Sequence, residues 1–270
     1  MTQRSTRLAW TAAAATYLLI IFGAIVRITG SGLGCGEHWP LCNGSFLPPL
    51  DLPTMIELGH RVIAAAVSVL VVALAVVAWQ EGQAGTMSAR PRFTAYAAVV
   101  LLIVQVALGA ITVKLALPAW TVILHLGTAM LLLAALIVVA RGDKVLTWKP
   151  VAIGGAALGF VTVLMGALTA NMGAALACLG FPLCSGQVAP TDPLQHVQWT
   201  HRLLAYALAV YVLLWTLKGS DRGARHVLWL VLLQVGVAAA MVLLSLPHLL
   251  QAVHVAFGAG IWAGLVLAAL

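Results

Sequence analysis

Apolar residues dominate the chain in runs long enough to cross a membrane. A helix needs roughly 20 apolar residues to span about 30 Å of hydrocarbon. The runs predict eight transmembrane helices, at about 9–27, 56–79, 93–113, 119–140, 151–171, 197–217, 227–246 and 249–268. They are continuous and lack the apolar and polar alternation of membrane β-strands. The first run is too long for a signal peptide and has no typical cleavage site, so we count it as a helix. The pattern therefore predicts an all-α integral membrane protein.

Composition agrees with this pattern. Hydrophobic residues make up 63% of the 270 residues and charged residues 8%, whereas about a quarter of a soluble domain is charged. The formal net charge is +7, but no aqueous basic domain accompanies it, so nucleic-acid binding is excluded.

The basic residues indicate which way the helices insert, because cytoplasmic loops carry an excess of Lys and Arg. Ten of the fourteen fall on the side that holds both termini. They are Arg4, Arg7, Arg90, Arg92, Arg141, Lys144, Lys149, Lys218, Arg222 and Arg225. We expect a multi-pass protein of the cell (plasma) membrane, surrounded by lipid, with both termini cytoplasmic and the long loops 28–55 and 172–196 outside.

All four cysteines lie in these two loops. Thiols outside the cytoplasm oxidise and stay oxidised, so we expect one disulfide in each loop, Cys35–Cys42 and Cys178–Cys184. Neither pair has the CxxC spacing of a zinc site. Whether the first pair is redox-active or structural stays open.

The chain contains an internal duplication. FGAIVRITGSGLGC matches MGALTANMGAALAC, with twelve residues from glycine to cysteine in both, and ELGHR matches QWTHR. In each half, a proline lies seven residues and a glutamine twenty residues before the histidine of the last predicted helix. We predict two tandem, pseudo-symmetric four-helix bundles, residues 1–142 and 143–270, which insert the same way round because four is an even number.

Four of the eight histidines occupy duplicated positions within predicted helices: His60, His125, His201 and His254. Each lies about five residues into its helix, so each half holds two at one depth, roughly 8 Å below the outer boundary. Ionisable groups inside a membrane usually mark function, and two histidines facing each other in a helical bundle can ligate a haem iron from both sides. The alternative is a pair of structural hydrogen bonds between helices. The other four, which have no counterpart, are expected at the surface: His38, His196, His226 and His248.

The halves differ beside the first histidine of each pair. Glu57 lies three residues before His60 and on the same helix face, whereas Gln198 takes this position in the second half. This favours proton-coupled chemistry in the first half and a bound cofactor in the second. Arg61 and Arg202 follow the histidines, and we expect them to pair with haem propionates or to extend to the headgroups.

Taken together, these motifs resemble the haem A synthase family along nearly the whole chain. GAIVRITGSGLGCGEHWPLCNG followed by ELGHR, the second cysteine loop, THR and the late histidines carry the resemblance. It implies haem B as cofactor in the C-terminal half, with His201 and His254 as axial ligands. It also implies haem O as substrate in the N-terminal half, with His60 and His125 as ligands or close neighbours, Glu57 as catalytic carboxylate, and Cys35–Cys42 near the substrate.

The implied reaction oxidises the C8 methyl group of haem O to a formyl group. Two hydroxylations give an alcohol and then a gem-diol, which loses water. Implied partners are haem O synthase and cytochrome oxidase assembly factors; the electron acceptor, a quinone or a protein, is not encoded in any motif. Two other functions fit the four histidines: a bis-histidine cytochrome b that carries electrons, and a haem transporter or chaperone.

Overall fold

The chain folds into two compact units, Met1–Thr147 and Trp148–Ala269, in a computed structural model. The structure describes residues 1–46, 48–142, 149–219 and 221–270. In these residues, eight helices are long and apolar enough to cross a membrane, which confirms the predicted all-α membrane fold. The expected boundary after residue 142 and the basic Lys144 fall at or within 143–148, outside the described residues. The expected pseudo-symmetry between the halves stays a prediction.

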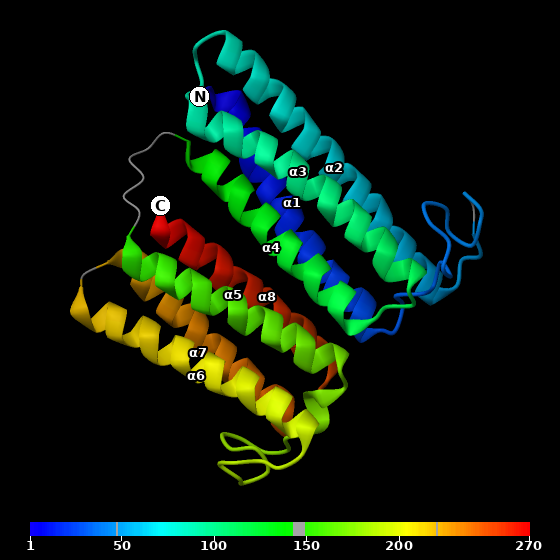
Figure 1. Cartoon of the computed structure of the whole chain (residues 1–270), viewed down its shortest axis with the longest axis vertical. Helices are drawn as coiled ribbons and strands as arrows, with labels where there is room; N and C mark the ends of the chain where they lie inside the picture. The colour runs from blue at the N-terminus through cyan, green and yellow to red at the C-terminus, as the bar shows by residue number, and fades with distance from the viewer. Residues whose placement is uncertain (47, 143–148, 220) are drawn as a thin grey trace. The chain divides into compact units, whose positions relative to one another are not determined.

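The first unit is a four-helix bundle (Figure 1). Its helices are α1 (Gln3–Ile28), α2 (Leu52–Gln83), α3 (Ala89–Lys114) and α4 (Ala119–Arg141). Each helix packs on the next, and α4 packs on α1. The helices therefore follow one another around the bundle, and α2 lies diagonally opposite α4.

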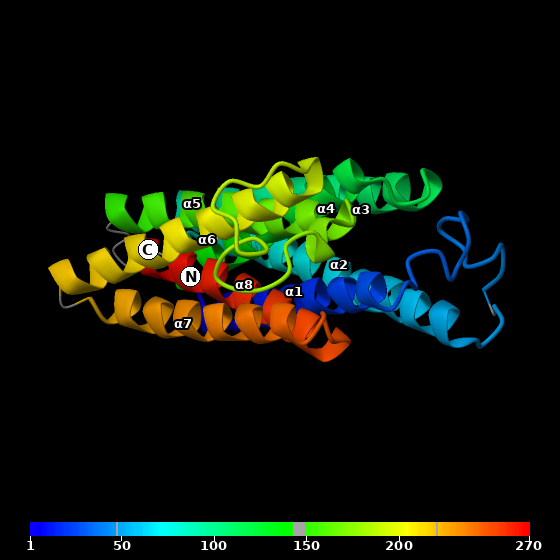
Figure 2. The same cartoon turned by 90° about the horizontal axis from the view of Figure 1, so that it is seen from below.

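The second unit repeats this order of packing. Its helices are α5 (Pro150–Asn171), α6 (Pro193–Lys218), α7 (Arg222–Leu243) and α8 (His248–Ala269), with a short 3₁₀ turn, Ala174–Leu176, before α6. Helix α5 packs on both α6 and α8, and α7 also packs on both α6 and α8. Helices α6 and α8 are therefore diagonally opposite. In each unit the long cysteine loop leaves the bundle at the end where its second helix begins (Figure 2).

Aspartate caps fix the start of the two helices that carry the first histidine of each pair. The side chain of Asp51 accepts the backbone N–H of Thr54, and that of Asp192 accepts those of Leu194 and Gln195. Each cap is followed by a proline in the first turn, a position that proline favours because its missing N–H would have no helical partner. Both helices begin about one turn earlier than predicted from apolarity. The histidines on α2 and α6 therefore lie about two turns from the start of their helices, rather than the five residues predicted.

The predicted helix at 227–246 extends three residues too far at its C-terminal end, because α7 ends at Leu243. Ser245 and Leu246 have φ angles of 59° and 62°, in the left-handed region that a right-handed helix cannot continue through. The backbone N–H of Leu246 donates to Met241 at 2.8 Å and closes the turn. Both leucines are apolar, so hydrophobicity alone does not mark this helix end.

An ion pair ties the start of α5 to the start of α7. Lys149 Nζ lies 2.7 Å from Asp221 Oδ2, and Asp221 Oδ1 also accepts the N–H of Gly223 as the cap of α7. The hydrogen bond from Lys149 and then the one from Gly223 lower the pKa of the Asp221 carboxyl below its ordinary value.

We expect this pair to stabilise the second unit in a pH-dependent way. Because the pKa of Asp221 is lowered on folding, its contribution is complete above the ordinary aspartate pKa of about 4 and disappears as pH falls through the lower folded value. Asp221→Asn keeps the cap but loses the charge, so it should cost up to about 1 kcal/mol at pH 7 for this partly exposed pair. Thermal unfolding of the two proteins should converge near pH 2. An unchanged difference at that pH would contradict the assignment.

Candidate functional site

In the second unit, two imidazoles from opposite helices face each other. The rings of His201 on α6 and His254 on α8 have centroids 6.4 Å apart and planes inclined by 78°. Metal–imidazole bonds are about 2 Å long, so two such bonds and the half-width of two rings come to about 6 Å. The spacing is therefore suitable for one metal ion bound by both rings.

Hydrogen bonds set the orientation of these rings. His201 Nδ1 lies 3.1 Å from the backbone carbonyl oxygen of Thr162 on α5. The carbonyl can only accept, so Nδ1 carries the hydrogen and Nε2 keeps its lone pair, as in many metal-binding histidines. His254 Nε2 lies 3.3 Å from the amide nitrogen of Gln234 on α7.

The first unit has a related arrangement. His125 Nε2 on α4 lies 3.1 Å from the amide nitrogen of Gln105 on α3. The ring of His60 on α2 packs 6.1 Å from that of Phe22 on α1. Each predicted histidine pair therefore lies within one unit, and His201 and His254 are the pair whose ring centroids lie 6.4 Å apart.

Besides Arg141 Nε, four buried side-chain polar atoms have no hydrogen-bond partner among the described residues. They are Gln105 Oε1, His125 Nδ1, Gln234 Oε1 and His254 Nδ1. Buried polar groups are normally paired, since leaving one unpaired costs about 1–3 kcal/mol. The four atoms recur beside the second histidine of each pair, so both bundles leave polar groups unpaired at matching positions.

Glycines on the neighbouring helices make room for the rings. A Cβ atom added at Gly23 would lie 3.3 Å from His60, one at Gly109 would lie 3.1 Å from His125, and one at Gly166 would lie 2.9 Å from His201. Gly23 and Gly166 are the glycines found twelve residues before a cysteine in both halves of the sequence. The duplication thus contained a signal for these positions, although no role could be read from it.

Replacing Gly166 with alanine is expected to displace the His201 ring, because the new Cβ would lie 2.9 Å from its Cε1 atom. Alanine is otherwise favoured over glycine inside a helix by about 1 kcal/mol, so helix propensity cannot cause a loss. We expect a reduced content of the cofactor bound through His201, measured by absorbance per purified protein. Gly236→Ala is the matched control, since nothing lies within 4 Å of a Cβ there. Equal losses in both variants would contradict this prediction.

The predicted carboxylate lies under the first cysteine loop. Glu57 is 4% exposed; its Oε2 accepts the backbone N–H of Cys35 at 2.8 Å, and its Oε1 accepts Arg61 Nη2 at 2.5 Å and Nε at 3.1 Å. Gln198 holds the second loop in the same way, since its Oε1 accepts the N–H of Cys178 at 2.7 Å. Glu57 and Gln198 therefore both accept the backbone N–H of a loop cysteine, but only the glutamate can carry a negative charge.

Both predicted arginines hold loop backbone. Arg61 Nη1 donates to the carbonyl oxygens of His38 and Leu41, at 2.9 and 3.1 Å. Arg202 Nη1 donates to Gly180 and Leu183, and its Nη2 donates to Cys178. Sequence reasoning missed these carbonyl partners, because no residue type marks them. Pairing of the arginines with propionates stays a prediction.

Both predicted disulfides are present. Cys35 pairs with Cys42 and Cys178 with Cys184, with Cα atoms 4.4 and 4.5 Å apart. All four cysteines are buried. Each disulfide therefore lies inside its loop, next to the backbone that Glu57 or Gln198 holds.

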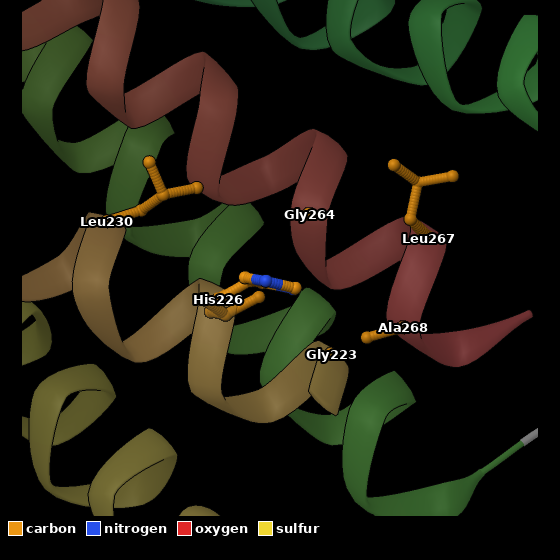
Figure 3. Close-up of a pocket in the computed structure, with 7 residues that line it drawn as sticks. Gly223, His226, Leu230, Gly264, Leu267 and Ala268 are labelled. Carbon is orange, nitrogen blue, oxygen red and sulfur yellow. The ribbon is translucent and has the colours of Figure 1, made fainter. Parts of the chain in front are cut away.

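The remaining histidines stand apart from this arrangement. His38, His196, His226 and His248 are all exposed, as predicted. Figure 3 shows His226 beside a shallow cavity of about 170 Å³ between α7 and α8, lined mainly by apolar side chains and by Gly223 and Gly264. Gly264 lies ten residues beyond His254, about 15 Å along the helix, so this cavity is separate from the histidine pair. Within the described ranges, no cluster of three or more His, Cys, Asp or Glu could hold a metal ion.

Comparison with known proteins adds to these observations. A family model described as cytochrome oxidase assembly protein, COX15-CtaA, matches residues 6–55 and 51–266. A curated protein of Bacillus pumilus named heme A synthase is 34% identical over 211 residues, which is 72% of this chain and 68% of that protein. The heme A synthase of Symbiobacterium thermophilum is 35% identical over 274 residues, covering 91% and 88%. That of Bacillus licheniformis is 33% identical over 227 residues, covering 78% and 73%.

Proposed function

Because the chain belongs to the COX15-CtaA family of cytochrome oxidase assembly proteins, we propose that it is an enzyme that makes haem A from haem O. Family membership confirms the resemblance found in the sequence. Relatives named heme A synthase align with most of the chain, and the eight apolar helices suit a multi-pass membrane enzyme acting on a lipophilic porphyrin.

The observation that carries the proposal is the facing pair His201 and His254. Their 6.4 Å centroid spacing and the Nε2 of His201, left free by the hydrogen bond to Thr162, fit a haem iron held from both sides. The glycine at 166 and the unpartnered polar atoms at the bundle centre fit the same group. We assign haem B to this position, where it would supply one-electron redox chemistry.

The first unit is then the substrate half. We propose that His60 and His125 bind or border the iron of haem O, with Arg61 beside it. Gly23 and Gly109 support this assignment, since the absence of a side chain at each glycine leaves room for the ring of His60 or His125. Glu57 distinguishes this half from the other, where Gln198 stands.

Converting the C8 methyl group to a formyl group removes hydrogen from carbon and releases protons. Glu57 is the buried carboxylate of this half that lies near His60, on the same helix face. We propose that it takes up a proton released at the methyl carbon or orients the attacking water. To do so it would exchange one of its present bonds, to Arg61 or to the Cys35 N–H, for a bond to water or substrate.

We also propose the surroundings of the reaction. Both termini would lie in the cytoplasm and both cysteine loops outside, as the distribution of Lys and Arg predicts. Haem O synthase would deliver the substrate and cytochrome oxidase assembly factors would receive the product. A quinone or a protein would take up the electrons.

The proposal is tested by extracting haems from cells that express the chain together with a haem O synthase. Mass analysis should find haem A, absent from cells that carry the synthase alone. A haem transporter would bind haem without a formyl product. A bis-histidine cytochrome b would purify with two similar haems B and also give no haem A. Either result would exclude haem A synthesis.

A further inference from the structure

The two histidine sites differ in the charge that lies beside them. In the first unit, Glu57 and Arg61 form an ion pair, with 2.5 Å between Oε1 and Nη2 and side chains 5% and 16% exposed. The carboxylate and the guanidinium cancel each other's charge. Near His60 this pair is therefore close to neutral.

In the second unit, the matching arginine has no carboxylate beside it. Arg202 is 7% exposed and donates three hydrogen bonds of 2.8–3.0 Å to backbone carbonyl oxygens. These carbonyls solvate the cation without carrying a formal charge. Gln198, in the position of Glu57, is a neutral amide whose nitrogen donates to the carbonyl of Ala175 at 3.0 Å.

The carboxylates of the second unit are accounted for elsewhere. Asp192 caps α6 ten residues before Arg202, about 15 Å along the helix. Asp221 is engaged by Lys149. No ion pair to Arg202 occurs in the part of the chain that the structure describes. Among the described side chains, no carboxylate therefore pairs with the buried positive charge of Arg202, the residue that follows His201.

We propose that Arg202 raises the reduction potential of the haem held by His201 and His254, and so makes it the better electron acceptor of the two haems. This inference rests on the proposed function. Reduction adds one electron to the iron, and a buried positive charge nearby favours the reduced form, because Coulomb interactions are strong where water is excluded. Local charge is among the factors by which proteins set haem potentials. The neutral Glu57–Arg61 pair gives the substrate half no such bias.

This difference would give electron transfer a direction. Electrons removed from the substrate in the first half would move favourably to the haem of the second half. The duplicated scaffold would thus obtain two electrochemically distinct sites from a single exchange of glutamate for glutamine.

The test places a carboxylate next to Arg202. Gln198→Glu should be tolerated, because Glu57 accepts a cysteine N–H in the same way and at nearly the same distance, 2.8 against 2.7 Å. Spectroelectrochemical titration of the purified full-length protein should show a lower midpoint potential for haem B. We expect the ratio of reduced to oxidised haem at fixed potential to fall by roughly tenfold, which is about 59 mV for a one-electron couple.

Two further variants keep the test decisive. Arg202→Lys retains the charge and should leave the potential close to that of the unmodified protein. Glu57→Gln should shift the midpoint potential of the haem in the first half in the opposite direction, to a higher value. If Gln198→Glu loses its haem, this second variant still tests whether a carboxylate beside the arginine lowers the potential. Unchanged potentials in the haem-loaded carboxylate and amide variants would overturn the role of Arg202. Absence of haem from the unmodified protein would instead overturn the proposed function, and this inference with it.

Discussion

Replacing His254 with alanine is expected to remove haem B from the protein while the haem of the first half is retained. His254 and His201 approach from opposite helices of one bundle, so alanine at either position would leave the iron of the proposed haem with a single imidazole and open a cavity beside the porphyrin. Haem extracted from the purified variant should contain little haem B, and its reduced spectrum should lose the low-spin bands typical of two histidine ligands.

His248→Ala is the matched control for this variant. His248 lies on the same helix but is exposed, so its loss should leave haem content and spectrum unchanged. His60→Ala should give the complementary pattern, with haem B kept and haem O or haem A reduced. Full haem B content in His254→Ala would show that the pair does not hold the cofactor.

Glutamine at position 57 is expected to abolish most conversion of haem O to haem A without displacing the loop. The amide can still accept the N–H of Cys35, as Gln198 does for Cys178 in the second unit. It cannot take up a proton at neutral pH, and removing a general base typically slows a reaction by about 10²–10⁴-fold. The ratio of haem A to haem O in extracts of cells that also express haem O synthase measures the effect.

Glu37→Gln provides the comparison for this experiment, since it removes an exposed carboxylate from the same loop. Conversion should remain normal in that variant. If Glu57→Gln also converted haem O fully, the carboxylate would act only as an anchor for the loop. The redox titration described above would still report its charge.

Apolar run length predicted the eight helices, because crossing hydrocarbon imposes one physical requirement on each of them. The residues at which the helices begin and end depended on capping and turn geometry instead. Capping by Asp51 and Asp192 starts α2 and α6 earlier than predicted, and the left-handed turn at Ser245 ends α7 earlier than predicted. Polar caps and turn geometry contribute little to hydropathy, so the pattern of apolar residues could not place these ends.

The candidate site was predicted through its side chains but not through its backbone. Duplicated offsets identified the four histidines, and the glutamines twenty residues before His125 and His254 prove to be their hydrogen-bond partners. The carbonyl oxygens that hold Arg61 and Arg202 could not be identified, because every residue carries one. Loop folding alone decides which carbonyls come within reach of a guanidinium group.

The anchoring of the first cysteine loop by Arg61 bears on thiol chemistry. The bonds from its guanidinium to the carbonyl oxygens of His38 and Leu41 do not involve sulfur, so they would persist after a reductant opened Cys35–Cys42. The loop therefore has an anchor on α2 that does not depend on the disulfide. Opening the Cys35–Cys42 disulfide would thus leave the bonds from Arg61 to the loop backbone in place.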